Sequence, residues 1–165
     1  SIRIPLIMWN PSLKNPQKVD ELVLNIDLAP SLLDIVGAPI PEHMQGESWV
    51  PLLQPDGEGR DGFLYEYYKE SDYRPRGGFP GTPTLHAYRT EDWKLVRYPD
   101  GDYKSELYHI SADPKELYNH AQNPEYAAKL VELNGKLDAY LTSIEYVAPE
   151  KIPGGGITHQ QLYDN

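Results

Sequence analysis

The sequence contains no cysteine, which excludes disulfides, thiolate catalysis and cysteine-based zinc sites. It has no run of the roughly 18 apolar residues that a membrane-spanning helix needs. It also has no cluster of Lys and Arg, and its formal net charge is −10. Because a surface that binds nucleic acid needs clustered cations, we expect no nucleic acid partner and no membrane span.

Catalytic motifs are also missing. The sequence has no P-loop, no G-x-G-x-x-G, no H-E-x-x-H and no G-x-S-x-G elbow. None of the five histidines has a partner at metal-ligand spacing. The residues by themselves therefore predict no catalytic residue and no metal site in this chain.

The first third of the chain predicts one strand and one helix. Residues 2–9 are mostly apolar, which is typical of a strand buried on both faces, and they follow Ser1 at once, so we expect the chain to begin in mid-protein. Residues 27–36 predict a helix with Asp27 as its N-terminal cap and Gly37 as its stop. The apolar face of this helix consists of Leu28, Leu32, Ile35 and Val36.

The rest of the chain predicts a small sheet and a long helix. From Asn123 to Ile144, apolar residues recur at steps of three and four, the pattern of a helix that packs on a sheet. The fold class is therefore α+β: a four-stranded antiparallel sheet with one long C-terminal helix, preceded by a strand and helix of a larger α/β domain. The expected strands are residues 63–68, 85–90, 93–98 and 106–110, and the expected divisions are 1–60, 61–147 and a tail, 148–165.

Five short runs occur in order between residues 2 and 145. They are Ile2 to Met8; Ile26 to Leu33 with Gly37; Met44 to Ser48 with Pro51 to Leu53; Arg89 to Leu95; and Glu106 to Tyr108 with Asp113, Glu116 and Asn119. In this order they resemble the C-terminal portion of the formylglycine-dependent sulfatases, in the arylsulfatase family of the alkaline-phosphatase-like superfamily. The resemblance implies a sulfuric ester hydrolase as the parent protein.

The family's chemistry, as the resemblance implies it, uses a formylglycine made in a C/S-x-P-x-R motif and a calcium ion. Neither that motif nor a Cys occurs here, and the family's metal acids and catalytic Lys correspond to positions upstream of Ser1. We therefore expect the chain to be inactive alone and to work with a missing N-terminal sulfatase domain. The parent's substrate would be a sulfated carbohydrate or another sulfate ester, and a periplasmic or secreted location would fit the family.

In the family, the C-terminal subdomain closes one wall of the substrate cleft. Residues 69–84 form a long loop rich in Pro and Gly, and His86 follows it directly. We therefore predict that His86, with Arg74 and Arg76, binds substrate. The competing interpretation of His86 is a solvated side chain at a strand end.

Two other interpretations remain open. One is a free-standing carbohydrate-binding or accessory module, and the other is a fragment of a related phosphatase or phosphodiesterase. A strand at residues 2–9 has no sheet to join within the chain, which favours a part of a larger α/β domain. It also predicts exposed apolar surface and self-association of the isolated chain.

Overall fold

The fold was analysed in a computed structural model of the chain, which describes residues 4–11, 16–54, 56–69, 82–99 and 103–147. It divides into two compact units, residues 1–59 and residues 60–165. Each unit is described by itself. The expected tail, 148–165, lies outside the described residues.

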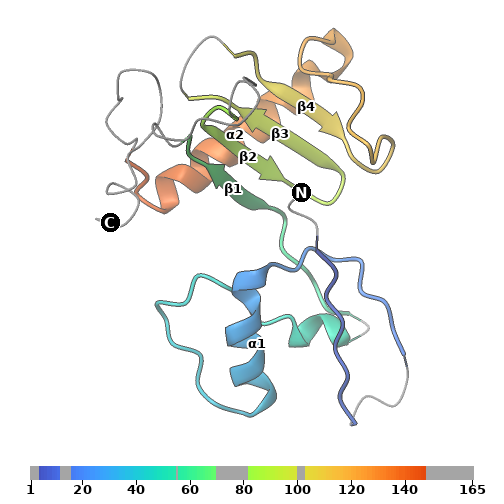
Figure 1. Cartoon of the computed structure of the whole chain (residues 1–165), viewed down its shortest axis with the longest axis vertical. Helices are drawn as coiled ribbons and strands as arrows, with labels where there is room; N and C mark the ends of the chain where they lie inside the picture. The colour runs from blue at the N-terminus through green and yellow to red at the C-terminus, as the bar shows by residue number, and fades with distance from the viewer. Residues whose placement is uncertain (1–3, 12–15, 55, 70–81, 100–102, 148–165) are drawn as a thin grey trace, which may run out of the picture. The chain divides into compact units, whose positions relative to one another are not determined.

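The second unit contains a four-stranded antiparallel sheet with the strand order β1-β2-β3-β4 (Figure 1). Each strand therefore pairs with its neighbour in the sequence, as consecutive elements of a chain usually do. The α+β fold class and its small sheet are confirmed. The strands are β1 (Phe63–Tyr67), β2 (Leu85–Arg89), β3 (Trp93–Arg97) and β4 (Glu106–His109).

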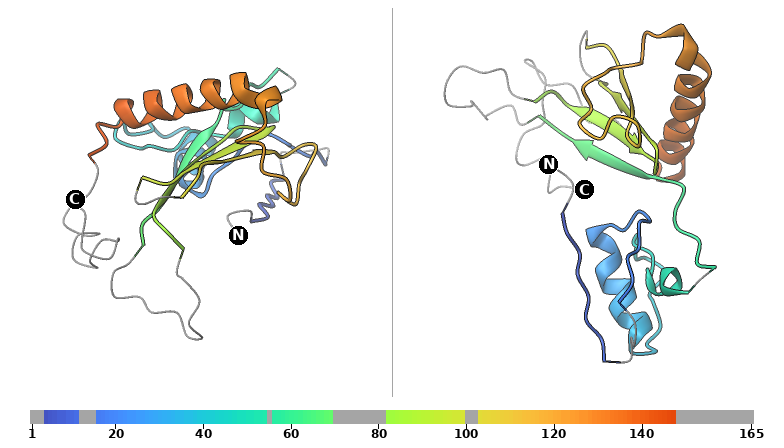
Figure 2. Two further views of the ribbon diagram at one scale, coloured as in Figure 1. Left: turned by 90° about the horizontal axis from the view of Figure 1, so that it is seen from above. Right: turned by 90° about the vertical axis from the view of Figure 1, so that its right-hand side faces the viewer.

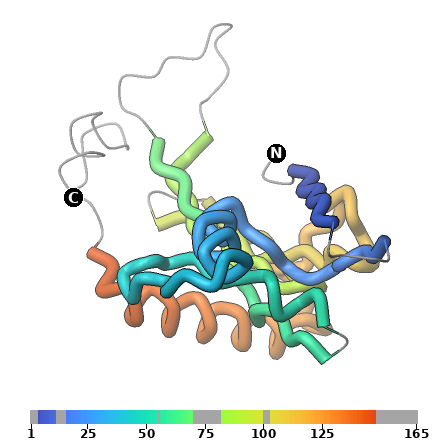
Figure 3. The backbone as a smooth tube through the Cα atoms, turned by 90° about the horizontal axis from the view of Figure 1, so that it is seen from below, coloured from blue at the N-terminus to red at the C-terminus, as the bar shows by residue number. Residues whose placement is uncertain are grey.

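A long helix, α2 (Ala127–Ser143), covers one face of this sheet (Figure 2, and the tube in Figure 3). A 3-10 turn, Pro124–Tyr126, leads into it, and the Asn123 side chain accepts a hydrogen bond from the Glu125 backbone N–H at 3.1 Å. Asn123 therefore caps the N-terminus of this turn. Among the described residues, no helix has the length and apolar character to cross a membrane.

The core lies between α2 and the sheet. Since side chains alternate across a strand, the residues at every second position meet the helix. The buried cluster consists of Tyr88, Leu95, Leu107, Leu133 and Leu137. Leu133 and Leu137 are one helical turn apart, so the periodicity of the sequence identifies the buried face of α2 correctly.

The first unit is built around the helix α1 (Leu28–Ile35), which continues a 3-10 turn, Asn25–Asp27. Gly37 has a φ of +69°, a conformation that glycine adopts without steric cost, and its N–H donates to the Asp34 carbonyl. The predicted stop at Gly37 is therefore confirmed. A second 3-10 turn, Val50–Leu53, follows in the same unit.

Two expectations for the first unit are wrong. Residues 4–9 form no strand, and Ile4, Leu6, Ile7 and Trp9 are exposed. A strand exists only where a neighbour accepts and donates its backbone hydrogen bonds, and the described part of this unit has no other strand. Asp27 also makes no capping bond within α1. Its carboxylate instead accepts from the backbone N–H groups of Leu24 and Glu47.

The apolar face predicted for α1 is present but is not buried by the rest of the first unit. Leu28, Leu32, Ile35 and Val36 are all exposed, whereas Pro30 and Ser31 of the same helix are buried. Periodicity identifies which residues share a face, but it does not identify what covers that face.

Gly46 provides a test of how tightly the first unit is packed. A Cβ added at Gly46 would overlap the backbone carbonyl of Ile26, so Gly46→Ala should lower the free energy of unfolding by about 1–3 kcal/mol. Gly135 in α2 has nothing within 4 Å of an added Cβ, so Gly135→Ala should raise stability by about 0.5–1 kcal/mol. Urea unfolding followed by circular dichroism measures both. Equal effects of the two substitutions would contradict the close approach at Gly46.

Candidate functional site

His86, the principal predicted site residue, lies on β2 and is only 2% exposed. It shares the helix-covered face with Tyr88. Its ring stands perpendicular to that of Tyr146, just after α2, with centroids 4.9 Å apart. Its Nε2 lies 3.5 Å from a carboxylate oxygen of Glu66 on β1. The imidazole therefore lies where two strands and the end of the helix meet.

Tyr68 belongs to the same group of side chains. Its hydroxyl donates to the Glu66 carboxylate at 2.7 Å, and its ring lies 6.4 Å from that of His86. Burial, followed by the hydrogen bond to Glu66, raises the pKa of Tyr68 well above its ordinary value. Tyr68 therefore stays protonated at neutral pH and acts as a hydrogen-bond donor rather than as a base.

The other two predicted site residues, Arg74 and Arg76, lie outside the described residues. The structure therefore does not test whether they lie near His86, and the substrate-binding assignment of all three stays a prediction. Within the described ranges, no group of three or more His, Asp or Glu side chains could hold a metal ion.

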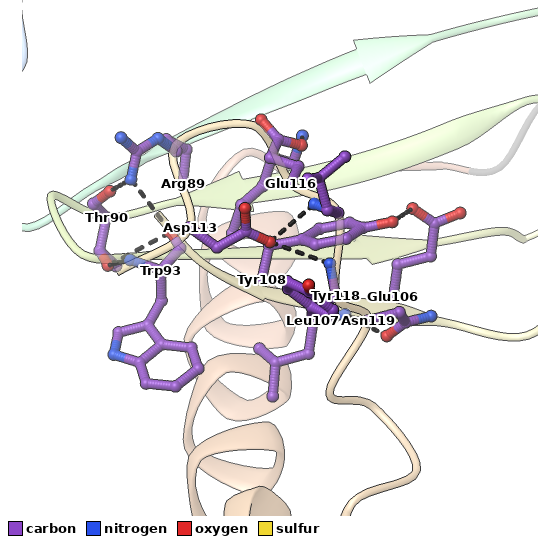
Figure 4. Close-up of polar contacts among 12 residues, drawn as sticks. Arg89, Thr90, Trp93, Glu106, Leu107, Tyr108, Asp113, Glu116, Tyr118 and Asn119 are labelled. Atoms are coloured by element: carbon purple, nitrogen blue, oxygen red, sulfur yellow. Dashed lines mark hydrogen bonds and ion pairs between the residues drawn. The ribbon is translucent and has the colours of Figure 1, made fainter. Parts of the chain in front are cut away.

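Figure 4 shows side chains from two of the sequence runs, Arg89 to Leu95 and Glu106 to Asn119, together with their polar contacts. The β2–β3 turn is held by Arg89, whose guanidinium donates to the backbone carbonyls of Thr90 and Glu91. The Trp93 N–H donates to the Thr90 hydroxyl, and the Thr90 N–H donates to the Trp93 carbonyl at 2.8 Å. The run from Arg89 to Leu95 is therefore a hairpin whose polar side chains satisfy its own backbone.

Asp113 and Glu116 form the turn that follows β4. The Asp113 carboxylate accepts from the backbone N–H groups of Leu117 and Tyr118, at 2.6 and 2.9 Å. Glu116 has a φ of +55°, a left-handed conformation that is uncommon for a side chain of its kind, and it pairs with Lys94 of β3. The ion pair fixes this turn against the sheet.

Asn119 protects the outer edge of β4. Its Oδ1 accepts from the N–H of Leu107 at 3.0 Å and from the N–H of Ala121 at 2.9 Å. The His120 N–H in turn donates to the Leu107 carbonyl at 2.8 Å. An unpaired strand edge attracts other strands. Here the Asn119 side chain and the His120 N–H pair with the outward N–H and carbonyl of Leu107, as a neighbouring strand would.

Glu106 is held by two phenols. The hydroxyls of Tyr98 and Tyr108 donate to its two carboxylate oxygens at 2.6 and 2.7 Å. Burial first, and then the hydrogen bond to Glu106, raises the pKa of both tyrosines. Both hydroxyls are therefore donors at neutral pH, and neither is a nucleophile.

In the first unit, the run from Ile26 to Leu33 also contains polar side chains that bond backbone groups. Ser31 is fully buried, and its hydroxyl accepts from the Trp49 N–H at 3.0 Å and donates to the Asp27 carbonyl at 2.6 Å. The Glu47 N–H donates to the Asp27 carboxylate at 3.0 Å. Several polar side chains of the sequence runs in both units therefore bond backbone groups. Sequence reasoning predicted such a role only for Asp27, as the cap of a helix.

The comparison with protein families gives one match over most of the chain. The model for N-sulphoglucosamine sulphohydrolase, C-terminal, matches residues 1–143. Arylsulfatase K of the dog (Canis lupus familiaris) is 33% identical over 150 residues, which cover 87% of this chain and 26% of the relative. The N-acetylglucosamine-6-O-sulfatase of Bacteroides thetaiotaomicron is 31% identical over 139 residues, 79% of this chain and 23% of the relative. The chain thus spans about a quarter of the length of the curated relatives it matches.

Solved structures agree with this match. A protein in complex with its substrate D-glucosamine-2-N,6-O-disulfate is 30% identical, with a TM-score of 0.64 over 78% of this chain and 26% of its own. A phosphonate monoester hydrolase of Agrobacterium radiobacter has a TM-score of 0.56 over 84% of this chain and 29% of its own. At 23% identity, this second likeness shows a shared fold and nothing about the reaction.

The contacts of Asn119 predict a specific cost of its removal. Asn119→Ala leaves the Leu107 N–H without its acceptor, so the free energy of unfolding should fall by about 1–3 kcal/mol. Asn119→Asp keeps an acceptor oxygen for Leu107 and Ala121 and should retain most of that stability. Urea denaturation measures the series. If the Asp variant lost as much stability as the Ala variant, the acceptor role would be wrong.

Proposed function

The chain belongs to the sulfatase family as a C-terminal domain of the N-sulphoglucosamine sulphohydrolase type, and from this premise we propose a division of labour. The chain is the C-terminal part of a larger sulfatase, contributes one wall of the substrate cleft, and is inactive alone. The nucleophile and the metal site belong to an N-terminal catalytic domain of the parent, of which residues 1–60 are the C-terminal remnant.

One observation carries the proposed inactivity. The sequence has no Cys and no Ser-x-Pro-x-Arg, so it contains no residue from which the family's formylglycine could be made. Sulfate-ester hydrolysis by this family needs that group as the nucleophile, as the resemblance implies. The attacking atom must therefore come from another part of the parent.

The calcium ion that the family resemblance implies also favours a site in another part of the parent. Calcium takes six to eight oxygen ligands, which carboxylates, amides and carbonyls supply together. In the part of the chain that the structure describes, no group of three or more His, Asp or Glu side chains could hold a metal ion. The Asp113 carboxylate accepts from backbone N–H groups, and the Glu106 carboxylate accepts from the hydroxyls of Tyr98 and Tyr108. The residues present do not fit the ion, so we assign it to the rest of the parent.

The names of the relatives support a substrate class. One is an N-acetylglucosamine-6-O-sulfatase, and a solved relative at 30% identity carries a disulfated glucosamine as its substrate. We propose that the parent of this chain hydrolyses a sulfate ester of a carbohydrate. The position of the sulfate on the sugar stays outside the proposal.

The proposed wall is the region of residues 69–90. Arg74 and Arg76 lie in the β1–β2 connection, and a guanidinium forms paired, charge-assisted hydrogen bonds with an oxyanion. His86 lies at the base of that connection, where it contacts Glu66 and Tyr146. We propose that Arg74 and Arg76 contact the substrate, and that His86, which is 2% exposed, contributes to substrate binding indirectly, through the position of the hairpin.

The division of labour predicts the activity of two proteins. The 165-residue chain should release no sulfate from a 6-O-sulfated glucosamine, whereas its full-length parent should release sulfate with multiple turnovers. Ion chromatography of sulfate measures both, and a parent whose C/S-x-P-x-R residue is changed to Ala serves as the control. Turnover by the chain alone would refute the proposed inactivity. A parent without turnover on sulfated sugars would refute the substrate class.

The cleft wall predicts a kinetic effect in the parent. Arg74→Ala and Arg76→Ala should each lower kcat/KM by roughly tenfold or more, because a hydrogen bond to a charged group contributes about 1.5–3 kcal/mol. His86→Ala should lower kcat/KM as well. Lys129→Gln, on α2, where Lys129 pairs with Glu132 of the same helix, is the control and should leave kcat/KM unchanged. If all three variants kept the wild-type kcat/KM, residues 69–90 would not form the wall.

A further inference from the structure

The C-terminal end of α2 has a backbone conformation that is uncommon for the residue that adopts it. Glu145 has a φ of +52°, in the left-handed region where the end of a helix usually has a glycine. The Glu145 N–H donates to the Thr142 carbonyl at 3.1 Å, and the Tyr146 N–H donates to the Leu141 carbonyl at 2.9 Å. This pair of bonds is a Schellman motif, which ends the helix and fixes the direction in which Tyr146 leaves it.

Tyr146 contacts side chains from two strands of the sheet. Its ring stands perpendicular to that of His86 on β2, with centroids 4.9 Å apart. It also forms a side-chain hydrogen bond with Tyr68, the residue that follows β1. A single side chain at the end of α2 therefore bridges the end of β1 and the start of β2.

The bridged residues stand where the β1–β2 connection leaves the sheet. Beyond the last pair of the β1–β2 ladder, the Lys69 N–H donates to the Thr84 hydroxyl at 3.3 Å, and Thr84 is only 3% exposed. The neck of the connection is defined here as Tyr68, Lys69, Thr84 and His86. The two arginines of the proposed wall lie in the sequence between the two sides of this neck.

We propose that Tyr146 is a positioning residue, which fixes the neck and thereby the place from which the connection presents Arg74 and Arg76 to the substrate. The inference rests on the proposed function for the role of these arginines. It adds the end of α2 as the element on which substrate binding depends. The conformation of Glu145 supports it, because a side chain in the left-handed region persists only where the surrounding contacts fix it, as they do around Tyr146.

The positioning role predicts a change in KM in the full-length parent. Tyr146→Ala should raise the KM for a 6-O-sulfated glucosamine by roughly threefold or more and change kcat by less than about twofold, because it alters binding and not the reacting groups. Tyr146→Phe keeps the ring against His86 and should restore most of the wild-type KM. Tyr140→Ala is the matched control: its ring lies 6.4 Å from that of Tyr88 in the core, so it should lower the thermal midpoint and leave KM unchanged.

A double substitution tests whether Tyr146 acts through the arginines. In a parent that already carries Arg74→Ala and Arg76→Ala, Tyr146→Ala should raise KM no further, because the residues that it positions are gone. Tyr146→Leu, which keeps apolar volume, replaces the Ala variant if that variant does not fold. A wild-type KM in the Tyr146 variant, or an equal rise in KM from Tyr140→Ala, overturns the positioning role.

Hydrogen exchange of the parent, followed by mass spectrometry, measures the neck without any substrate. Tyr146→Ala should speed exchange in the peptide that contains Lys69, whereas Tyr140→Ala should not, since exchange reports local opening. Unchanged exchange overturns the proposal, and faster exchange with an unchanged KM reduces Tyr146 to a structural contact and overturns it too. A wild-type parent that releases no sulfate contradicts the proposed function, and the exchange rates then still decide whether Tyr146 fixes the neck.

Discussion

The packing of α2 across one face of the small sheet is the interaction on which the second unit depends. Leu95 and Leu107 of the sheet meet Leu133 and Leu137 of the helix, and all four are buried. Each fully buried leucine contributes about 1.5–3 kcal/mol through the removal of apolar surface from water. Four short strands would not be stable without a helix over one face, because small sheets need such a cover.

The polar side chains of the sequence runs bond the backbone of both units. Arg89, Asp113 and Asn119 each bond backbone groups that the turns and the edge of β4 would otherwise leave unpaired. Asp27 and Ser31 do the same in the first unit. The residues by which the chain is recognised as a sulfatase C-terminal domain are thus residues that hold backbone in place. This is consistent with a part of an enzyme whose reactive groups lie elsewhere in the polypeptide.

Local patterns in the sequence were sufficient to predict the strands and the long helix of the second unit. Alternation predicts β2 and β3, and the leucines three and four apart predict α2, because the partner of each element lies within the same unit. The role of Asn119 could not be predicted, since its acceptor bond reaches back 12 residues to Leu107. The direction in which α1 faces, and the missing strand at residues 4–9, could not be predicted, because periodicity does not identify what covers a face or pairs with a strand. The substrate-binding roles of His86, Arg74 and Arg76 stay predictions, because Arg74 and Arg76 lie outside the described residues.

The central claim is that this chain is one part of a larger sulfatase whose nucleophile lies in another part. The most direct measurement is to determine the coding sequence immediately upstream of Ser1. The account predicts an open reading frame that continues upstream and encodes a C/S-x-P-x-R motif together with several Asp and Asn residues suited to calcium. A start codon directly before Ser1, or an unrelated domain upstream of it, would contradict the account and favour a separate binding module.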